Sequence, residues 1–204
     1  MFHNISCAKR YCSSKAKMSA LSKVEMSVSE PYRAAGIALE AELAIARDEP
    51  EAGLDLLRGA LGTLHAQQFN LLITGFIGAS AEGLGKTGQF EEALFTINGA
   101  IARATNSGVE LDLPELLRIK SQILAARHDR ESAMNCLTEA LAVARALSAL
   151  AWELRSTMVL ARMLSEDGQR DQARHALNLV YDRFTEGFET ADLKLARALL
   201  EELQ

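Results

Sequence analysis

Two short segments carry residues that bind phosphate or act as nucleophiles in other proteins. Gly83-Leu-Gly-Lys-Thr87 contains the Gly-Lys-Thr end of a phosphate-binding loop, but that loop also needs a glycine five residues earlier, where this chain has Ser80. Gly78-Ala-Ser-Ala-Glu82 begins like the Gly-x-Ser-x-Gly turn that exposes a nucleophilic serine, but its last glycine is missing. Both motifs follow a strand in other proteins, whereas the periodicity described below predicts a helix here. We therefore expect a helix and the turn after it, with no phosphate or nucleophile site.

The cysteines and histidines are the residues that could hold a metal ion. His3, Cys7 and Cys12 could supply three ligands, but a structural zinc site needs four, and no second cluster follows. The third cysteine, Cys136, stands alone, and an odd number of cysteines favours a reducing compartment over a disulfide framework. Neither a His-Glu-x-x-His motif nor another catalytic constellation is present. The sequence therefore predicts no metal, no cofactor and no enzymatic activity.

Composition and charge exclude further classes of function. Of the 204 residues, 49% are hydrophobic, only 5% are aromatic and 3 are proline, while alanine and leucine are abundant, which favours an all-α protein. The net charge is −5 and the isoelectric point about 5.5, so we expect no direct nucleic-acid partner. No run of about 18 uninterrupted apolar residues occurs, so we expect no membrane span. The reducing compartment that the cysteines favour leads us to expect a cytoplasmic location.

The first 30 residues differ from the rest of the chain. Serine is frequent there, and the five basic residues Lys9, Arg10, Lys15, Lys17 and Lys23 precede the first glutamate, Glu25. This composition is typical of a transit peptide, although the apolar core of a secretory signal is missing. A disordered leader, or a reading frame started too early, explains the same composition and is our preferred interpretation. The sequence thus divides into a basic leader, 1–30, and a helical domain, 31–204.

A period of 40 residues runs through the second part of the chain. In four segments, a small residue is followed four places later by a large aliphatic one and three places after that by another small one. The three columns are Gly53, Ala93, Ala133 and Ala173; Leu57, Ile97, Leu137 and Leu177; and Ala60, Ala100, Ala140 and Val180. Spacings of four, three and seven put the columns on one helix face, where the small residues let a neighbouring helix approach closely.

The same period appears in the segment that precedes each of these helices. A small column, Ala41, Ala81, Ser121 and Ala161, lies between two mostly aliphatic columns, one with Ile37, Ile77, Leu117 and Thr157 and one with Ala44, Leu84, Leu124 and Leu164. Each repeat is therefore a pair of amphipathic helices, A and B. The predicted helices A are 32–47, 69–86, 114–127 and 149–166, and the helices B are 50–66, 89–106, 130–147 and 170–184. A ninth helix, 190–203, is predicted to cover the last repeat.

The turns between helices A and B also carry recognisable signals. Gly88 and Gly168 occupy equivalent places and suit the left-handed residue that ends a helix. Asp48, two residues before Pro50, suits the N-cap of the first helix B, and Asp129 suits that of the third.

These columns resemble the signature of tetratricopeptide (TPR) repeats. The match is clearest at Ala93, Ile97 and Ala100, at Ala133, Leu137 and Ala140, and at the helix-A residues Ala81 and Ala161. The chain departs from the family in its period, which is 40 instead of about 34, and in replacing the helix-A aromatic residues by aliphatic ones such as Ile77 and Leu84. The resemblance covers about residues 32–204. It implies an all-α, right-handed α-solenoid of about four helical hairpins with a C-terminal capping helix.

The longer period resembles the repeats of large bacterial signalling proteins, namely nucleotidyl cyclases and ATPase transcriptional regulators of the LuxR and MalT type. The segment from Tyr181 to Leu200 is similar to the end of cyclase-associated repeat regions. This resemblance implies a non-enzymatic scaffold for protein–protein interaction, a detached or truncated repeat region of a signalling or transcription regulator. The alternative is a solenoid that senses a small-molecule effector. The sequence has no counterpart of the cyclase or ATPase domains, so neither activity is carried over.

In the TPR family, helices A line the concave side of the solenoid, where peptides bind. The candidate binding residues that the resemblance implies are Glu82, Lys86, Arg118, Gln122, Arg155 and Arg162. We hypothesise that the three arginines form a basic clamp for a carboxylate or an acidic peptide, because the guanidinium group pairs bidentately with carboxylates. The alternative is that they are solvated, or paired with Glu115 and Glu153. The expected partner is a protein or peptide, and self-association through the solenoid ends or helix-B surfaces is also open.

Helix A of the second repeat carries the four glycines Gly75, Gly78, Gly83 and Gly85. An interior glycine destabilises a helix by about 1 kcal/mol relative to alanine. The glycines therefore indicate either close contact with a neighbouring helix or a flexible segment, and the sequence leaves both interpretations open.

Overall fold

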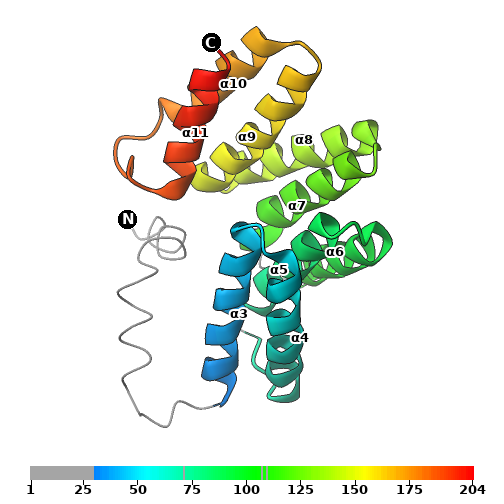
Figure 1. Cartoon of the computed structure of the whole chain (residues 1–204). Coiled ribbons are helices and arrows are strands. Elements are labelled where there is room, and N and C mark those ends of the chain that lie inside the picture. Colours follow the sequence, from blue (N-terminus) through cyan, green and yellow to red (C-terminus); the bar gives the residue numbers. More distant parts are fainter. Residues whose placement is uncertain (1–29, 71, 107, 109) are drawn as a thin grey trace. The chain divides into compact units, whose positions relative to one another are not determined.

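The computed structural model describes residues 30–70, 72–106, 108 and 110–204, and these form α-helices and one short 3-10 helix, with no strand among them (Figure 1). The all-α prediction is therefore confirmed. None of the described helices is both long and apolar enough to cross a bilayer. The helices group into two compact units, an N-terminal unit that ends at Ser148 and a C-terminal unit that begins at Ala149, and each unit is described by itself.

The N-terminal unit contains three helical hairpins. They are α3 (Glu30–Ala46) with α4 (Pro50–Ala66), α5 (Ile73–Lys86) with α6 (Phe90–Asn106), and α7 (Leu113–Ala126) with α8 (Arg130–Ala146), with the 3-10 helix η1 (Glu110–Asp112) before α7. Each helix A packs on the helix B that follows it, and α5 and α7 also pack on the hairpin before them. These hairpins are the predicted repeats. Helix α5 begins later than expected because Leu72, directly before it, has a left-handed backbone (φ 63°).

The C-terminal unit contains the fourth hairpin and the last helix. Helix α9 (Leu150–Glu166) pairs with α10 (Arg170–Tyr181), and α11 (Ala191–Glu202) packs against both of them. Leu193, Ala196 and Leu199 of α11 share one apolar cluster with Leu154 of α9 and Leu177 of α10. The last helix therefore covers the fourth hairpin, as the sequence predicts.

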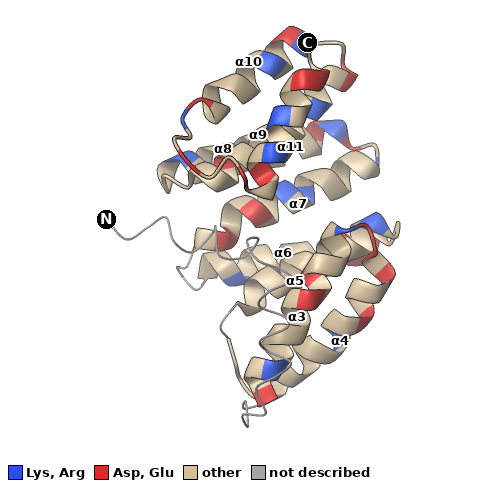
Figure 2. Ribbon diagram, turned by 60° about the vertical axis from the view of Figure 1, so that its left-hand side comes forward, with Lys and Arg blue, Asp and Glu red and all other residues tan. Residues whose placement is uncertain are grey.

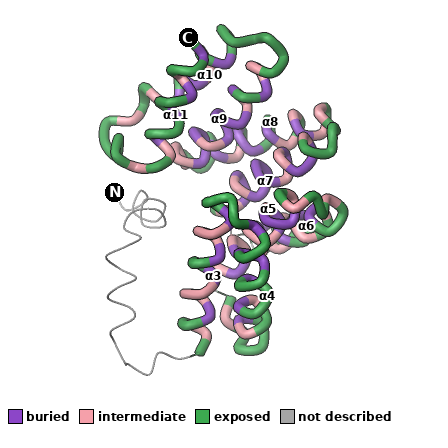
Figure 3. The backbone as a smooth tube through the Cα atoms, in the orientation of Figure 1, coloured by how far each residue is buried: buried purple, intermediate pink, exposed green. Residues whose placement is uncertain are grey.

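The repeated columns form the core of both units. Leu57, Ile97, Leu137 and Leu177 are all 0% exposed, and the small residues on either side of them are buried as well. Figure 3 shows buried positions recurring along the helices of both units. Residues of successive hairpins meet in the same cluster, since Ile73 and Phe76 of α5 pack with Leu57 and Ala60 of α4. Within the N-terminal unit, the matched large and small side chains therefore do what their spacing predicts, which is to bury one hairpin against the next.

The turns recur at half the repeat length. A residue with positive φ stands at intervals of 20 residues, at positions Asp48, Gln68, Gly88, Gly108, His128, Ser148 and Gly168. The prediction for Gly88 and Gly168 is thus confirmed, whereas the prediction that Asp48 caps α4 is wrong. Asp48 is the left-handed residue that ends α3, because it occupies the same place in its turn as Gly88. The residue before α4 is Glu49, whose side chain makes no capping hydrogen bond.

Asp129 does cap α8, as predicted, because its Oδ1 accepts a hydrogen bond of 3.2 Å from the backbone N–H of Ser132. Such a bond satisfies one of the N–H groups that the first turn of a helix leaves without an intrahelical partner.

Three of the four glycines in α5 stand where a neighbouring side chain leaves little room for a Cβ atom. A Cβ on Gly78 would lie 2.7 Å from Leu116 Cδ2, one on Gly85 would lie 2.9 Å from Ile123 Cγ1, and one on Gly83 would lie 3.0 Å from Leu54 Cγ. These contacts support the close-contact interpretation at these three positions. The glycines in α5 admit the larger side chains of α4 and α7.

Gly53 is explained in the same way by its own hairpin. A Cβ there would lie 2.5 Å from Ile45 Cγ1 and 2.9 Å from the backbone oxygen of Ala41. The residues equivalent to Ile45 in later repeats are small, namely Gly85, Ala125 and Ser165, and those repeats have alanine where the first repeat has Gly53. The bulk of Ile45 therefore accounts for the glycine in the first repeat.

Residues 1–29, and with them most of the predicted leader and the three ligands His3, Cys7 and Cys12, lie outside the described residues. Cys136 is described and is partly buried on α8. Burial raises the pKa of the Cys136 thiol above its ordinary value, although Lys120 opposes the shift.

Candidate functional site

Four of the six candidate residues lie on helices A of the N-terminal unit. Glu82 and Lys86 belong to α5, and Arg118 and Gln122 belong to α7. Glu82 and Gln122 are equivalent positions, each directly after the buried small residue of its repeat. One step along a helix turns a side chain by about 100°, which brings these residues to the edge of the packed face.

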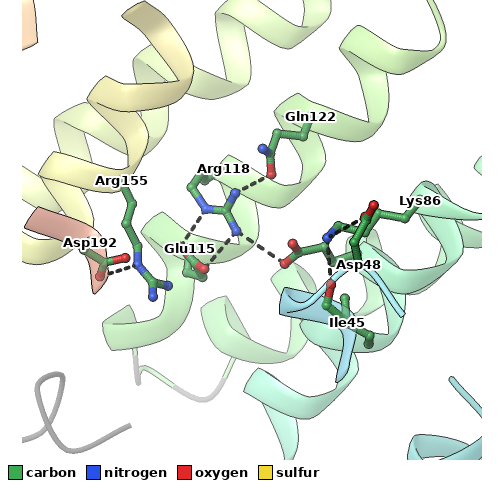
Figure 4. A network of polar contacts seen from close by, with 9 residues as sticks. Ile45, Asp48, Lys86, Glu115, Arg118, Gln122, Arg155 and Asp192 are labelled. Atoms are coloured by element: carbon green, nitrogen blue, oxygen red, sulfur yellow. Dashed lines mark hydrogen bonds and ion pairs between the residues drawn. The ribbon is translucent and has the colours of Figure 1, made fainter. Parts of the chain in front are cut away.

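Arg118 is the centre of a polar network on α7 (Figure 4). Its Nε and Nη2 donate to the two carboxylate oxygens of Glu115 at 2.8 and 2.9 Å. Nη2 also lies 3.4 Å from Glu82 Oε2 on α5, and Nη1 donates to Oε1 of Gln122. The structure therefore brings Glu82, Arg118 and Gln122 together, and it pairs Arg118 with Glu115, one of the two carboxylates considered for the arginines in the sequence.

The partners of Arg118 differ in how firmly they hold it. Glu115 forms the bidentate arrangement that makes arginine–carboxylate pairs strong, and the Arg118 side chain is only 10% exposed. Glu82 has the longest contact and is 28% exposed, so water and ligands can reach it. The carboxylates of Glu82 and Glu115 surround one guanidinium group, so the network is not a positively charged patch. Figure 2 shows both acidic and basic residues on α7.

Lys86 does not join this network. Its Nζ donates to the backbone oxygen of Ile45 at 2.7 Å and lies 3.7 Å from Asp48 Oδ1. The Ile45 oxygen belongs to the last turn of α3, where carbonyl groups lack intrahelical partners and the helix dipole favours a positive charge. Lys86 therefore ties the end of α3 to α5, across the first two repeats.

The other two candidates, Arg155 and Arg162, lie on α9 of the C-terminal unit. Arg155 Nε donates to Asp192 Oδ2 of α11 at 2.9 Å, and its guanidinium carbon lies 5.1 Å from the centroid of the Trp152 ring. Arg155 is thus held between α9 and α11 and is only 11% exposed. Arg162 is exposed, and the structure shows no ion pair between it and another described residue.

Glu153 and Arg183 form an ion pair that the sequence did not predict. Glu153 is almost fully buried on α9, and its Oε2 accepts a hydrogen bond of 2.5 Å from Nη1 of Arg183, in the connection between α10 and α11. The sequence indicated Glu153 as a partner for the clamp arginines, but it did not indicate Arg183 or Asp192 as partners. Asp192 lies in α11, after the fourth hairpin, and Arg183 lies in the connection because α10 ends at Tyr181, before the predicted end of that helix at 184.

Comparison with known proteins gives the fold class. No protein-family model matches the sequence, and no curated protein matches it. The crystal structure of BtubC (BKLC) from P. vanneervenii matches with a TM-score of 0.63 and 19% identity, over 85% of this chain and 74% of that one. A putative kinesin light chain from Podosopora anserina, with nearly identical TPR-like repeats, matches with a TM-score of 0.56 and 16% identity, over 86% and 87%.

The chain therefore has a TPR-like all-α repeat fold, which confirms the predicted fold class. At these identities the likeness shows the fold alone. The resemblance to cyclase-associated and LuxR or MalT-type repeats stays a prediction, and so does the clamp of Arg118, Arg155 and Arg162.

Proposed function

We propose that the chain is a non-enzymatic protein-interaction module that binds an extended peptide, or a segment of another protein, on the exposed edge of its helices A. The observation that carries the proposal is the network around Arg118. Ion pairs hold its side chains in place before any ligand arrives, and pre-ordered groups lose less conformational entropy on binding. The TPR-like fold supports the proposal as well, since repeats of this type present extended binding surfaces.

The network also indicates how an acidic ligand would bind. Glu115 holds Arg118 through two short hydrogen bonds, whereas Glu82 holds it through one contact of 3.4 Å. A carboxylate of the ligand would replace Glu82 at Nη2 and leave the pair with Glu115 intact. Glu82 then acts as a competitor that sets the affinity for acidic peptides.

Selection from a random peptide library against the full chain tests the partner class. We expect acidic peptides to be enriched, and peptides in which Asn and Gln replace Asp and Glu to bind at least tenfold more weakly, a difference of about 1.4 kcal/mol. Enrichment of basic or purely apolar peptides alone would rule out the acidic clamp while leaving an interaction module in place.

Substitution of Glu82 tests the mechanism. Glu82→Gln removes the competing charge, so the selected acidic peptides should bind about three- to tenfold more tightly, measured by calorimetry. Glu92→Gln is the matched control, because Glu92 is an exposed acid on helix B of the same hairpin. An equal gain for both variants would mean that only the net charge matters.

The contribution of the C-terminal unit is tested at Arg162. This exposed arginine can be changed to alanine without breaking an ion pair between described residues, unlike Arg118 and Arg155. If the clamp includes Arg162, Arg162→Ala weakens binding of the selected acidic peptides by several-fold. Unchanged affinity would remove Arg162 from the clamp.

We also propose that the module belongs to a bacterial signalling or transcription regulator. The similarity of the segment from Tyr181 to Leu200 to cyclase-associated repeats supports this origin. A cyclase or ATPase gene next to this one would strengthen the proposal, and its consistent absence in relatives would end it. The alternative function is that of an effector sensor. The C-terminal unit has an open hollow of about 410 Å³ between Gly168–Gln172 and the last two residues. Most of the residues that line this hollow are exposed, so it gives little support to an effector site.

A further inference from the structure

Helix α3 has a second apolar stripe opposite its core face. The core face is Ala34, Ala38, Ala41 and Ile45, which are buried in the first hairpin. The second stripe, called here the outer seam, consists of Tyr32, Gly36, Leu39, Leu43 and Ala46. Its alternating spacing of four and three residues is that of the a and d positions in a coiled coil. Leu39 is 37% exposed, and Tyr32 is 60% exposed although the edge of one ring meets the face of the other between Tyr32 and Phe69, with centroids 5.2 Å apart.

The equivalent positions in later repeats show what such a seam is for. Leu116, Ile119 and Ile123 of α7 are at most 3% exposed and pack in one cluster with Ala81 of α5 and Ile97 of α6. In α5, Phe76 packs in the same way against the first hairpin. This column therefore faces the preceding hairpin, and for α3 no preceding hairpin exists among the described residues.

The upstream sequence does not continue the repeat that would cover the seam. In the 40-residue frame, the residues equivalent to Gly53, Leu57 and Ala60 would be Ser13, Lys17 and Ala20. Lysine stands where the equivalent residues Leu57, Ile97 and Leu137 are 0% exposed. A lysine is almost never fully buried without a partner, so the sequence of this segment does not match the helix-B columns of the later repeats.

A second copy of α3 fits the seam when it runs antiparallel. In one register, Leu39 lies over Gly36 of the second copy and Leu43 lies over its Tyr32. The two-fold symmetry of the dimer repeats both of these contacts with the copies exchanged. Gly36 has the room that this needs, since a Cβ placed there would meet nothing within 4 Å. Large residues then face small ones, or fill the space beside an aromatic ring, which is the basis of close packing between helices.

The charges beside the seam select this register. Arg33, Glu40 and Arg47 occupy one flank at intervals of seven residues and are all exposed. With Leu39 over Gly36, Arg33 lies opposite Glu40 of the second copy, twice by symmetry. The register shifted by one heptad would place Arg33 opposite Arg47 and Glu40 opposite Glu40, and like charges facing each other disfavour it.

We propose that the chain forms an antiparallel homodimer through the outer seam of α3, with Arg33 and Glu40 of the two copies paired across it. The inference rests on the packing of the first repeat and is independent of the proposed peptide site. It implies an isologous interface, in which the same residues of both copies take part.

Sedimentation equilibrium of the full chain over a wide concentration range tests the proposal. The expected result is a reversible dimer that Leu39→Glu weakens by at least tenfold. Leu179→Glu is the matched control, because Leu179 is an exposed leucine on α10. A monomer at all concentrations would overturn the proposal, whether or not residues 1–29 are what covers the seam. Equal weakening of the dimer by Leu39→Glu and Leu179→Glu would also overturn it.

Charge reversal tests the pairing itself. Arg33→Glu and Glu40→Arg should each weaken the dimer by about tenfold, since each change places like charges opposite each other twice, and the double variant should restore it to within about threefold. Circular dichroism checks that every variant keeps its helices. The antiparallel register would be overturned if the single variants did not change the dimer affinity, or if the double variant dimerised more weakly than either single variant. Direct evidence of a parallel dimer would overturn it as well.

Discussion

The two units share one 40-residue pattern but hold their helices A with different chemistry. In the N-terminal unit, α7 buries Leu113, Leu116 and Leu117, and glycines in α5 make room for its larger side chains. At the equivalent positions of the C-terminal unit, α9 buries Glu153, Ser156 and Thr157. The buried carboxylate is balanced by Arg183 from outside the hairpin. The pattern therefore indicates which positions are buried, whereas the carboxylate at one of them, Glu153, depends on Arg183 from outside the hairpin.

The column of large aliphatic residues should contribute about equally to the stability of both units. Leu57→Ala and Leu177→Ala each empty a position that is 0% exposed, and each should lower the free energy of unfolding by about 2–5 kcal/mol. Urea unfolding followed by circular dichroism measures both. A loss below about 1 kcal/mol for Leu177→Ala alone would show that the C-terminal core is held mainly by polar contacts.

The loss of stability on breaking an ion pair should be larger for the buried carboxylate of the C-terminal unit than for an exposed pair of the N-terminal unit. Arg183→Ala leaves the Glu153 carboxylate buried without this partner, and we expect a loss of about 1–3 kcal/mol, below the value for fully buried pairs because Arg183 is 52% exposed. Arg58→Ala, which breaks an exposed pair with Asp55, should cost less than about 0.5 kcal/mol. Equal losses for these two variants in thermal unfolding would contradict a buried role for Glu153.

Two glycines of α4 separate close packing from helix propensity. Gly53→Ala inserts a methyl group against Ile45 and should destabilise the N-terminal unit by about 1–2 kcal/mol. Gly59→Ala on the same helix points into open space and should stabilise it by about 0.5–1 kcal/mol. Chemical denaturation of both variants gives the signs, and the same sign for both would mean that Ile45 moves aside.

The turns should show the smallest effects and should behave alike in both units. His128→Gly relieves a left-handed backbone in the N-terminal unit and should stabilise it by up to about 1 kcal/mol, whereas Gly168→Ala in the C-terminal unit should destabilise it by about 1 kcal/mol. Melting temperatures would report both shifts. A destabilising His128→Gly would show that the imidazole side chain does more than occupy the turn.

Much of this fold was predictable because each helix repeats one rule. The spacing of Leu57, Ile97, Leu137 and Leu177 alone indicates the core. The prediction for Asp48 was wrong because aspartate occurs both as an N-cap and as a left-handed residue at a helix end. Only the equivalence of Asp48 and Gly88 within the turn decides between these two roles.

The candidate site was predictable only in part, for a physical reason. Glu115 and Arg118 are three residues apart on one helix, so their pair could be anticipated. The contact of Arg118 with Glu82 depends on the stacking of α5 and α7, and the partners of Arg155 and Glu153 come from α11 and from the connection before it. Such contacts depend on the packing of separate elements, which residue spacing does not specify.

A double-mutant cycle between Gly78 and Leu116 tests the central claim, that equivalent side chains of successive hairpins fill each other's space. Gly78→Ala crowds Leu116, and Leu116→Ala empties the same place, so the methyl group added by the first change should partly fill the cavity in the double variant. The account predicts that the double variant is more stable, by about 1 kcal/mol or more, than the sum of the single changes. Additive effects would contradict it, because they would mean that α5 and α7 do not meet at these residues.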